Sequence, residues 1–308
     1  MAFNKKHILS LSDLTPGEIE TVLDTAESMK EVSSRDVKKV PALKGITVVN
    51  LFFEPSTRTR SSFEIAEKRL SADVLNFASS QSSIVKGESL VDTAKNLEAM
   101  GASIIVIRHS MSGAPFVIAR EINASIINAG DGSHEHPSQG LLDLFTVRRI
   151  KGSIKGLNVL IVGDILNSRV ARSDIFGFLK LGANVRIVGP GSIIPKYFKE
   201  LGVKIYYSLE DSLQDVDVVI MLRVQAERKS LEYFPSLREY SKFYGLNKDK
   251  LRIAKNDVIV MHPGPINRGV ELTSEIADDQ KAVILDQVSN GIAIRMAMLY
   301  LVSSGENN

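Results

Sequence analysis

The stretch ITVVNLFFEPSTRTR, residues 46–60, decides the fold class, because it joins a strand pattern directly to the start of a helix. Residues 46–53 are rich in β-branched and aromatic side chains, and this composition predicts a buried strand. Residues 58–70 carry apolar side chains at helical spacing, including Phe63 and Leu70. A strand followed at once by a covering helix is the repeating unit of a parallel α/β sheet.

The same alternation of short strand patterns and longer helix patterns continues through the chain. Predicted strands cover residues 74–77, 104–108, 125–128, 157–162, 185–188, 205–206, 216–222 and 258–261. Predicted helices cover residues 15–32, 89–100, 115–121, 137–150, 168–181 and 288–302. This order predicts an α/β fold built from parallel sheets that are covered by helices.

The segment KGSIKG, residues 151–156, would be a hinge between two such halves. The length of 308 residues also allows one large α/β barrel with additions. We predict two similar-sized domains, each a parallel sheet flanked by helices, with the C-terminal helix packing back on the first domain. The first would comprise residues 1–150 plus about 288–308, and the second residues 151–287. Ligands of such folds bind at the carboxyl ends of the strands.

The composition excludes several functional classes. Hydrophobic residues make up 44% and charged residues 24%, which argues against disorder. The net charge of +2, with both signs interspersed, predicts no nucleic-acid partner. The longest apolar runs, such as residues 104–107, are far shorter than the ~20 residues of a membrane span. The chain has no cysteine, so thiol nucleophiles and disulfides are excluded, and we expect a cytoplasmic protein.

A candidate anion site lies where the first strand meets its helix. Ser56, Thr57, Arg58 and Thr59 combine hydroxyls, the N–H groups of a helix N-terminus and a planar cation. The alternative is an ordinary helix cap beside solvated arginines. The Gly-Lys-Ser/Thr of a nucleoside-triphosphate loop is missing, which favours a small phosphorylated metabolite. Arg108 ends another strand and would reach the same sheet edge.

A second motif, HEHPSQ at residues 134–139, also follows a strand and enters a helix. His136 and Gln139 could converge there on a ligand. The alternatives are a capping histidine or a metal site at residues 134–136. No His-Glu-x-x-His is present and no further ligand stands at suitable spacing, so no metal is predicted. Residues 159–164, VLIVGD, lack the G-x-G-x-x-G of a dinucleotide site, and no cofactor is predicted.

These motifs occur in an order that resembles the transcarbamoylase family over nearly the whole chain. The matching segments are FEPSTRTRSSFE at residues 53–64, KGE at 86–88, HPSQ at 136–139 and HPGP at 262–265. NSRVARS at residues 167–173 and RVQAER at 223–228 are similar to the aspartate-specific branch. The ornithine-specific branch typically has His-Cys-Leu-Pro in place of HPGP, and this chain has no cysteine.

The resemblance implies transfer of the carbamoyl group of carbamoyl phosphate to the α-amino group of L-aspartate, in de novo pyrimidine synthesis. No metal or cofactor is needed. By similarity, Ser56, Thr57, Arg58 and Thr59 hold the phosphate, and Arg108 bridges the phosphate and the carbonyl oxygen. Thr59, Arg108 and His136 would stabilise the developing oxyanion. The carbamoyl NH₂ would donate to Gln139 and to the carbonyls around Pro263, Gly264 and Pro265.

Aspartate has two carboxylates, and the second half of the chain offers cations to bind them. Arg169 and Arg223 each follow a predicted strand, so both lie at the carboxyl edge of a sheet, where arginine can clamp a carboxylate. Gln225 is a further candidate. Arg172 and Arg228 are weaker, because each could pair with a neighbouring surface carboxylate.

The resemblance further implies a homotrimer in which Ser82 and Lys86 are borrowed by the neighbouring subunit and Lys86 helps to bind aspartate. On its own, the segment around Lys86 would be a surface loop. Regulatory chains or a dihydroorotase could join a larger assembly. Two alternatives remain: a transcarbamoylase for another amino acid such as ornithine, and an inactive homologue that serves as a scaffold. The intact Arg58 and His136 argue against the second.

Overall fold

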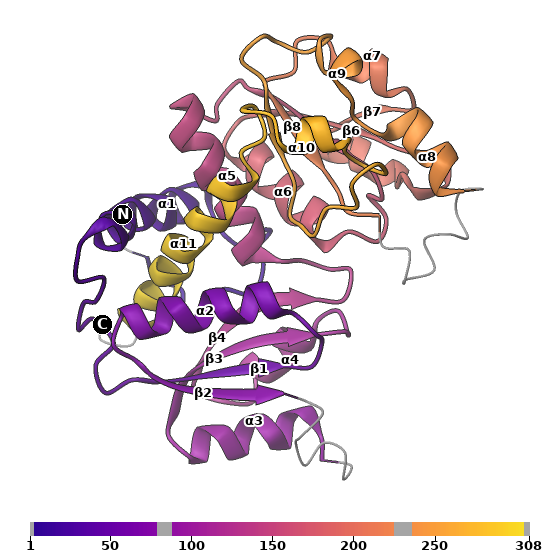
Figure 1. Cartoon of the computed structure of the whole chain (residues 1–308). Helices are drawn as coiled ribbons and strands as arrows, with labels where there is room; N and C mark the ends of the chain where they lie inside the picture. Colours follow the sequence, from indigo (N-terminus) through magenta and orange to yellow (C-terminus); the bar gives the residue numbers. More distant parts are fainter. Residues whose placement is uncertain (1–2, 79–87, 225–235, 305–308) are drawn as a thin grey trace. The chain divides into compact units, whose positions relative to one another are not determined.

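The computed structural model describes residues 3–78, 88–224 and 236–304 (Figure 1). The chain divides into two compact units. Unit 1 comprises Met1–Phe145 and Ser289–Asn308, and unit 2 comprises Thr146–Val288. Each unit contains one parallel sheet with helices against it, which confirms the predicted fold class.

The sheet of unit 1 has the strand order β2-β1-β3-β4. Its strands are β1 (Thr47–Phe52), β2 (Asp73–Ala78), β3 (Ala102–His109) and β4 (Ser125–Asp131). The N-terminal segment lies along the outer edge of β4: the Ile8 N–H donates to the Ile126 carbonyl at 2.9 Å, and the Ile8 carbonyl accepts from the Asn128 N–H at 2.9 Å. This pairing covers a strand edge that would otherwise be open.

Helices cover both faces of this sheet (Figure 1). They are α1 (Pro16–Ser34), α2 (Thr57–Arg69), α3 (Leu90–Ala99), α4 (Ala114–Ala119), α5 (Pro137–Lys151) and α11 (Ile284–Ser304). Leu97 of α3 and Ile118 of α4 share one hydrophobic core with Leu51 and Ile107, whereas α2 packs on β1 and β2. The guanidinium of Arg295 in α11 lies 5.1 Å from the ring centroid of Phe63 in α2. The C-terminal helix therefore packs on unit 1, as predicted.

The sheet of unit 2 has the order β7-β6-β5-β8-β9, and all neighbours are parallel. Its strands are β5 (Asn158–Val162), β6 (Asn184–Val188), β7 (Lys204–Tyr206), β8 (Val218–Met221) and β9 (Ile259–Met261). The helices are α6 (Arg169–Lys180), α7 (Leu209–Leu213), α8 (Leu237–Tyr244), α9 (Lys248–Leu251) and α10 (Ser274–Ala277), with 3₁₀ turns at Gly191–Ile193 and Lys196–Leu201. A buried core of aliphatic side chains, including Leu160, Val219 and Val260, lies beneath these elements.

Each sheet has a point at which the strand order reverses. In unit 1 the chain leaves β1 toward β2 and returns to β3 on the other side, and in unit 2 it leaves β5 toward β6 and β7 and returns to β8. The loops at such a point separate, and open α/β sheets bind their ligands in the resulting crevice at the carboxyl ends of the strands.

The segment between β8 and β9 contains helices that the sequence pattern did not predict. α8 begins after Ser236, whose hydroxyl accepts from the Glu239 N–H at 3.1 Å, and it buries Tyr240 fully. Within the described part of the chain, none of the helices combines the length and the apolar character needed to cross a bilayer.

Candidate active site

Three loops of unit 1 meet at one edge of its sheet. Phe52 in β1 is the register partner of Arg108 in β3, and the Phe53 N–H donates to the Arg108 carbonyl at 2.9 Å. Across the next pair of strands, His109 is the partner of Asp131. The STRTR motif after β1, Arg108 at the end of β3 and the HPSQ motif after β4 are therefore brought together by parallel pairing.

The N-terminus of α2 lacks a side-chain cap. Ser56 occupies the N-cap position, but its hydroxyl makes no cap hydrogen bond, whereas Thr15 and Ser168 cap α1 and α6 in the usual way. No acidic residue lies in the first turn of α2, and Thr57 and Arg58 are exposed. Uncapped N–H groups and the positive end of the helix dipole favour an anion at this position. The cap hydrogen bond of the ordinary-cap alternative is therefore absent at Ser56, whereas Arg58 is exposed as that alternative expects.

Arg108 is positioned from two sides. Its Nε lies 3.3 Å from Oε2 of Glu54, and its Nη1 donates to the Ala129 carbonyl at 3.3 Å. The side chains of Arg108 and Glu54 are each 14% exposed, so this ion pair is only partly screened by solvent. The arrangement fixes the guanidinium between the ends of β1 and β4, where it can reach a ligand at the sheet edge.

His136 stands directly before α5 and is buried. Its Nδ1 lies 3.3 Å from the Ser138 hydroxyl, which is fully buried. A hydroxyl that donates to Nδ1 leaves the ring proton on Nε2, and this nitrogen is then a donor suited to a developing oxyanion. Sequence reasoning did not assign a role to Ser138, although the residue lies inside the HPSQ motif.

Glu135 has a structural role that the sequence did not indicate. Its fully buried carboxylate accepts from the Leu11 N–H at 2.8 Å and from the Ser12 N–H at 3.1 Å. These bonds attach the N-terminal segment of the chain to the loop that carries His136. The partner residues stand 124 and 123 positions earlier, so no local pattern reveals them.

His134 pairs with Asp131, whereas the neighbouring Glu135 binds backbone N–H groups. Its Nδ1 lies 3.1 Å from Oδ2 of the fully buried Asp131. Burial works to raise the pKa of Asp131, but hydrogen bonds from His134 and the Gly113 N–H lower it below its ordinary value. Over the described residues, no group of three or more His, Asp or Glu side chains is arranged to hold a metal ion.

Gln139 lies in the first turn of α5 and is 9% exposed. Its Nε2 donates to both oxygens of Asp143, at 3.1 and 3.2 Å. Asp143 is fully buried and lies one helical turn further along α5. Sequence reasoning missed this partner of Gln139, because an Asp at i+4 on a helix has no distinctive signature.

In unit 2, Arg169 and Arg223 each follow one of two adjacent strands. Arg169 is the first residue of α6 and only 6% exposed, and Arg223 follows β8 and is half-buried. β5 and β8 pair in parallel on either side of the point where the strand order reverses. Gly163 closes β5 at φ +129°, and a Cβ there would lie 2.9 Å from the Tyr240 hydroxyl, so only glycine fits.

The HPGP segment follows β9 at the same edge of the sheet. Nδ1 of His262 accepts from the Gly264 N–H at 2.7 Å, which leaves Nε2 as the protonated nitrogen that faces Glu271 Oε1 at 3.1 Å. Glu271 is fully buried and also accepts from the Asn267 N–H at 2.9 Å. His262 is therefore occupied in holding the loop at residues 263–265, whose carbonyls were predicted to contact a ligand.

Arg172 has partners of its own in unit 2. It donates to the Tyr197 hydroxyl and, at 3.2 Å, to the Leu166 carbonyl, and its guanidinium lies 5.8 Å from the Tyr197 ring centroid. These contacts differ from the predicted pairing with a surface carboxylate. The predicted site residues Ser82, Lys86 and Gln225, and the weaker candidate Arg228, lie outside the described residues.

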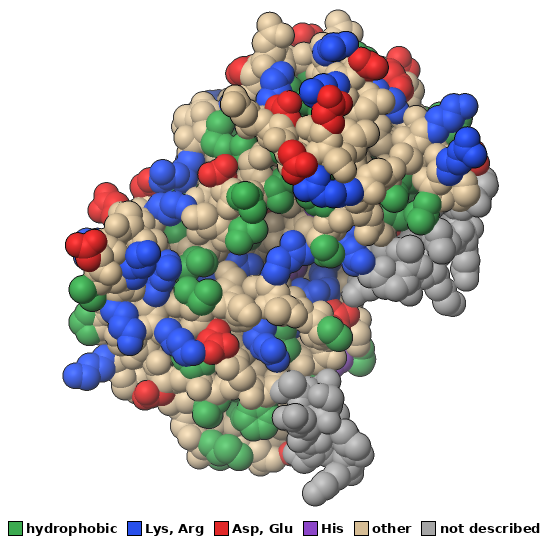
Figure 2. Space-filling model, in the orientation of Figure 1, with side chains coloured by type: hydrophobic (Ala, Val, Ile, Leu, Met, Phe, Trp, Pro, Cys, Tyr) green, Lys and Arg blue, Asp and Glu red, His purple; other side chains and the backbone are tan. Residues whose placement is uncertain are grey.

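Figure 2 shows Lys and Arg side chains interspersed with Asp and Glu on the face that it draws. A surface of mixed sign agrees with a small anionic ligand bound at specific residues better than with a broad polyanion.

Each of the two parallel sheets is followed by arginines beside its reversal point, Arg108 in unit 1 and Arg169 and Arg223 in unit 2, as expected of a transferase that handles anionic substrates. The chain belongs to the aspartate/ornithine carbamoyltransferase family. Residues 6–149 match the family model for the carbamoyl-P binding domain, and residues 155–302 match the model for the Asp/Orn binding domain.

Curated relatives with 55–59% sequence identity to this chain share one name. The aspartate carbamoyltransferase catalytic subunit of Syntrophotalea carbinolica is 59% identical over 99% of this chain and 98% of its own. The protein of the same name from Syntrophus aciditrophicus is 58% identical over the whole of both chains.

Solved structures agree on the fold. Aspartate transcarbamoylase from Trypanosoma cruzi, solved with carbamoyl phosphate and aspartate, has a TM-score of 0.87 at 30% identity and 97% coverage of both chains. Ornithine carbamoyltransferase from Pyrococcus furiosus has a TM-score of 0.89, also at 30% identity, over 99% of both chains. Fold similarity alone therefore does not separate the two activities.

Proposed function

We propose that this chain transfers the carbamoyl group of carbamoyl phosphate to the α-amino group of L-aspartate, with N-carbamoyl-L-aspartate and phosphate as products. The observation that carries the proposal is the 55–59% identity, over essentially the full length, to proteins named aspartate carbamoyltransferase catalytic subunit. The HPGP segment and the absence of cysteine also support aspartate over ornithine.

Carbamoyl phosphate is assigned to unit 1. The uncapped N-terminus of α2, with Ser56, Thr57, Arg58 and Thr59, would bind the phosphate. The partly buried Arg108 would bridge the phosphate and the carbonyl oxygen. In the reaction the amine lone pair attacks the carbonyl carbon, the carbonyl oxygen becomes negative, and the bond from carbon to the phosphate oxygen breaks.

The oxyanion is assigned to Thr59, Arg108 and His136. One donor of this kind is worth about 2.7–4 kcal/mol of barrier in well-studied enzymes. The carbamoyl NH₂ would donate to Gln139 and to the carbonyls of the loop that His262 holds, residues Pro263, Gly264 and Pro265. The proton released by the attacking amine would pass to the departing phosphate or to solvent.

L-Aspartate is assigned to unit 2, where Arg169 and Arg223 follow adjacent strands. Two arginines match the two carboxylates of this substrate, whereas ornithine presents one carboxylate and a second cation. Gln225 would assist. We propose that the protein is a cytoplasmic homotrimer. In it, Lys86 of the neighbouring subunit would supply a further cation, and Ser82 of that subunit a further contact. A larger assembly with regulatory chains or a dihydroorotase is compatible with this role.

The decisive experiment supplies the purified protein with carbamoyl phosphate and either aspartate or ornithine. Carbamoyl-aspartate and equimolar phosphate are expected, and ornithine is expected to react at less than a hundredth of that rate. The Arg108→Ala variant is the matched control and should lose roughly 10²–10³ in kcat. Faster turnover of ornithine would reassign the substrate, and no turnover of either would make the chain an inactive homologue.

A further inference from the structure

A buried polar side chain stands behind Gln139. Asp143 is fully buried, and both of its carboxylate oxygens lie within hydrogen-bond distance of the same atom, Nε2 of Gln139, at 3.1 and 3.2 Å. Both residues are on α5, one turn apart. The contact is therefore set by the helix and does not depend on a mobile partner.

The chemistry of this contact decides which end of the Gln139 amide faces away from Asp143. An ionised carboxylate only accepts hydrogen bonds, whereas an amide has a donating nitrogen and an accepting oxygen. The nitrogen must therefore face Asp143, and the oxygen is the atom left for another group. A glutamine without such a neighbour could present either end.

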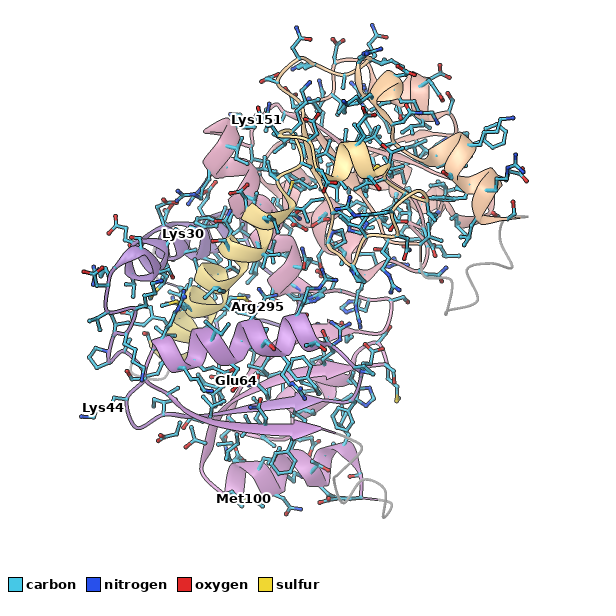
Figure 3. All side chains as sticks on the ribbon, in the orientation of Figure 1. Lys30, Lys44, Glu64, Met100, Lys151 and Arg295 are labelled. Atoms are coloured by element: carbon cyan, nitrogen blue, oxygen red, sulfur yellow. The ribbon has the colours of Figure 1, made fainter. Side chains whose placement is uncertain are left out.

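A buried cation on the C-terminal helix interacts electrostatically with Asp143. Figure 3 labels Arg295 on α11, and this arginine is 4% exposed. Burial lowers the pKa of Arg295 to about 10, while the negative charge of Asp143 acts to raise it. Arg295 thus remains a cation at neutral pH and attracts the carboxylate of Asp143.

We propose that Asp143 is a positioning residue that fixes Gln139 as a hydrogen-bond acceptor, so that the site selects an acyl phosphate with NH₂ on its carbonyl carbon over one with CH₃. The inference rests on the proposed function, because it concerns how the carbamoyl group is recognised. Acetyl phosphate is the natural probe, since it keeps the phosphate and the carbonyl and replaces NH₂ by a methyl group that cannot donate.

The test measures equilibrium binding of carbamoyl phosphate, acetyl phosphate and inorganic phosphate to wild type and to Asp143→Asn. The asparagine can donate to Gln139 and lets its amide turn around. Carbamoyl phosphate should bind about five- to tenfold more weakly, as expected for one lost hydrogen bond. Binding of the other two ligands should change less than twofold. An unchanged preference, or equal weakening of all three ligands, would overturn the inference.

A double-mutant cycle separates positioning from general loosening of the fold. Gln139→Ala alone should reduce the preference for carbamoyl over acetyl phosphate, and adding Asp143→Asn should change it no further. An additional loss on the Gln139→Ala background would show that Asp143 acts elsewhere. If Asp143→Asn lacks a cooperative thermal transition, the Asp143→Asn/Arg295→Met variant replaces it, because removing both buried charges together is better tolerated.

Failure of the proposed function gives a different result. A wild-type protein that binds carbamoyl phosphate with the expected preference but does not carbamoylate aspartate would contradict the assigned substrate and leave the role of Asp143 supported. A wild type that is active with aspartate, together with an Asp143→Asn variant of unchanged preference, would contradict only the role of Asp143.

Discussion

Nε of Arg108 lies 3.3 Å from Oε2 of Glu54, at the point where β3 and β1 end side by side. Glu54 is thus paired with the arginine that, in the proposed function, binds the phosphate and the carbonyl oxygen of carbamoyl phosphate. A phosphate that binds Arg108 must either displace Glu54 or share the cation with it, and the negative charge of Glu54 opposes its approach in both cases.

Replacing Glu54 with glutamine should therefore tighten the binding of inorganic phosphate. Removal of one negative charge at this range corresponds to about a three- to tenfold lower Kd at low salt, and less at high salt. Calorimetric titration at two ionic strengths measures the effect. Glu64→Gln is the control, because Glu64 forms an exposed pair with Lys68 on the same helix. Weaker phosphate binding in Glu54→Gln would mean that Glu54 organises Arg108 for the ligand instead of competing for it.

Arg223→Ala should separate the two substrates in steady-state kinetics. The aspartate KM should rise by one to two orders of magnitude, since each charge-assisted hydrogen bond to a carboxylate is worth about 1.5–3 kcal/mol. Binding of carbamoyl phosphate should stay within twofold of wild type. Arg172→Ala is the matched control, because Arg172 is already engaged by Tyr197 and Leu166. Unaltered aspartate kinetics in Arg223→Ala would remove this residue from the site.

Mixing two inactive variants tests whether Lys86 serves a neighbouring subunit. Lys86→Ala and His136→Ala should each be inactive as pure assemblies. After dissociation and reassembly together, some sites of a closed ring would combine an intact Lys86 from one chain with an intact His136 from the next. Activity should return in the mixture. Mixed assemblies of confirmed mass that remain inactive would place Lys86 in the site of its own chain or outside it.

Glu67 should make the stability of the protein depend on pH. It is fully buried and accepts from Asn50 Nδ2 at 2.8 Å. Burial raises its pKa from 4.5 to about 8, against the opposing effect of the hydrogen bond from Asn50. Between these values the folded state holds a proton that the unfolded state has released. This contribution to the free energy of unfolding is therefore lost as the pH rises, by at most about 1.4 kcal/mol per unit.

Urea unfolding of wild type and Glu67→Gln across pH 5–8 measures this contribution. The stability of wild type relative to the variant should decline with pH across this range, and less steeply as the pH approaches about 8. Glu200→Gln serves as the control, since that side chain is exposed and lies in unit 2. A stability difference between wild type and Glu67→Gln that does not change with pH would show that Glu67 is ionised in the folded protein.

Most of the fold could be predicted because its signals are local. The Thr15-Pro16-Gly17-Glu18 start yields α1 with its capping box, and the apolar run before Glu54 yields β1. α8 was missed because no helix was predicted between the strands at residues 216–222 and 258–261. The Ser236–Glu239 capping signal was present there, but the helix has only 8 residues and buries little besides Tyr240.

The sequence indicated which side chains stand at strand ends, since parallel strands bring their carboxyl ends to one edge. The sequence did not indicate which neighbouring residues position these side chains. Asp143 orients Gln139 through a common helical spacing, and Glu54 reaches Arg108 across two strands. The first relationship has no distinctive signature in the sequence, and the second depends on strand pairing and register, which only the folded chain shows.

The hydrogen bonds from Leu11 and Ser12 to Glu135 also affect the order in which parts of the protein can fold during its synthesis. Leu11 leaves the ribosome before its acceptor, which stands 124 residues later in the chain. At ordinary rates of translation it waits several seconds for that carboxylate, while β1, β2 and β3 can already be made. Leu11 and Ser12 can thus form these hydrogen bonds only after the loop that carries His136 has been made.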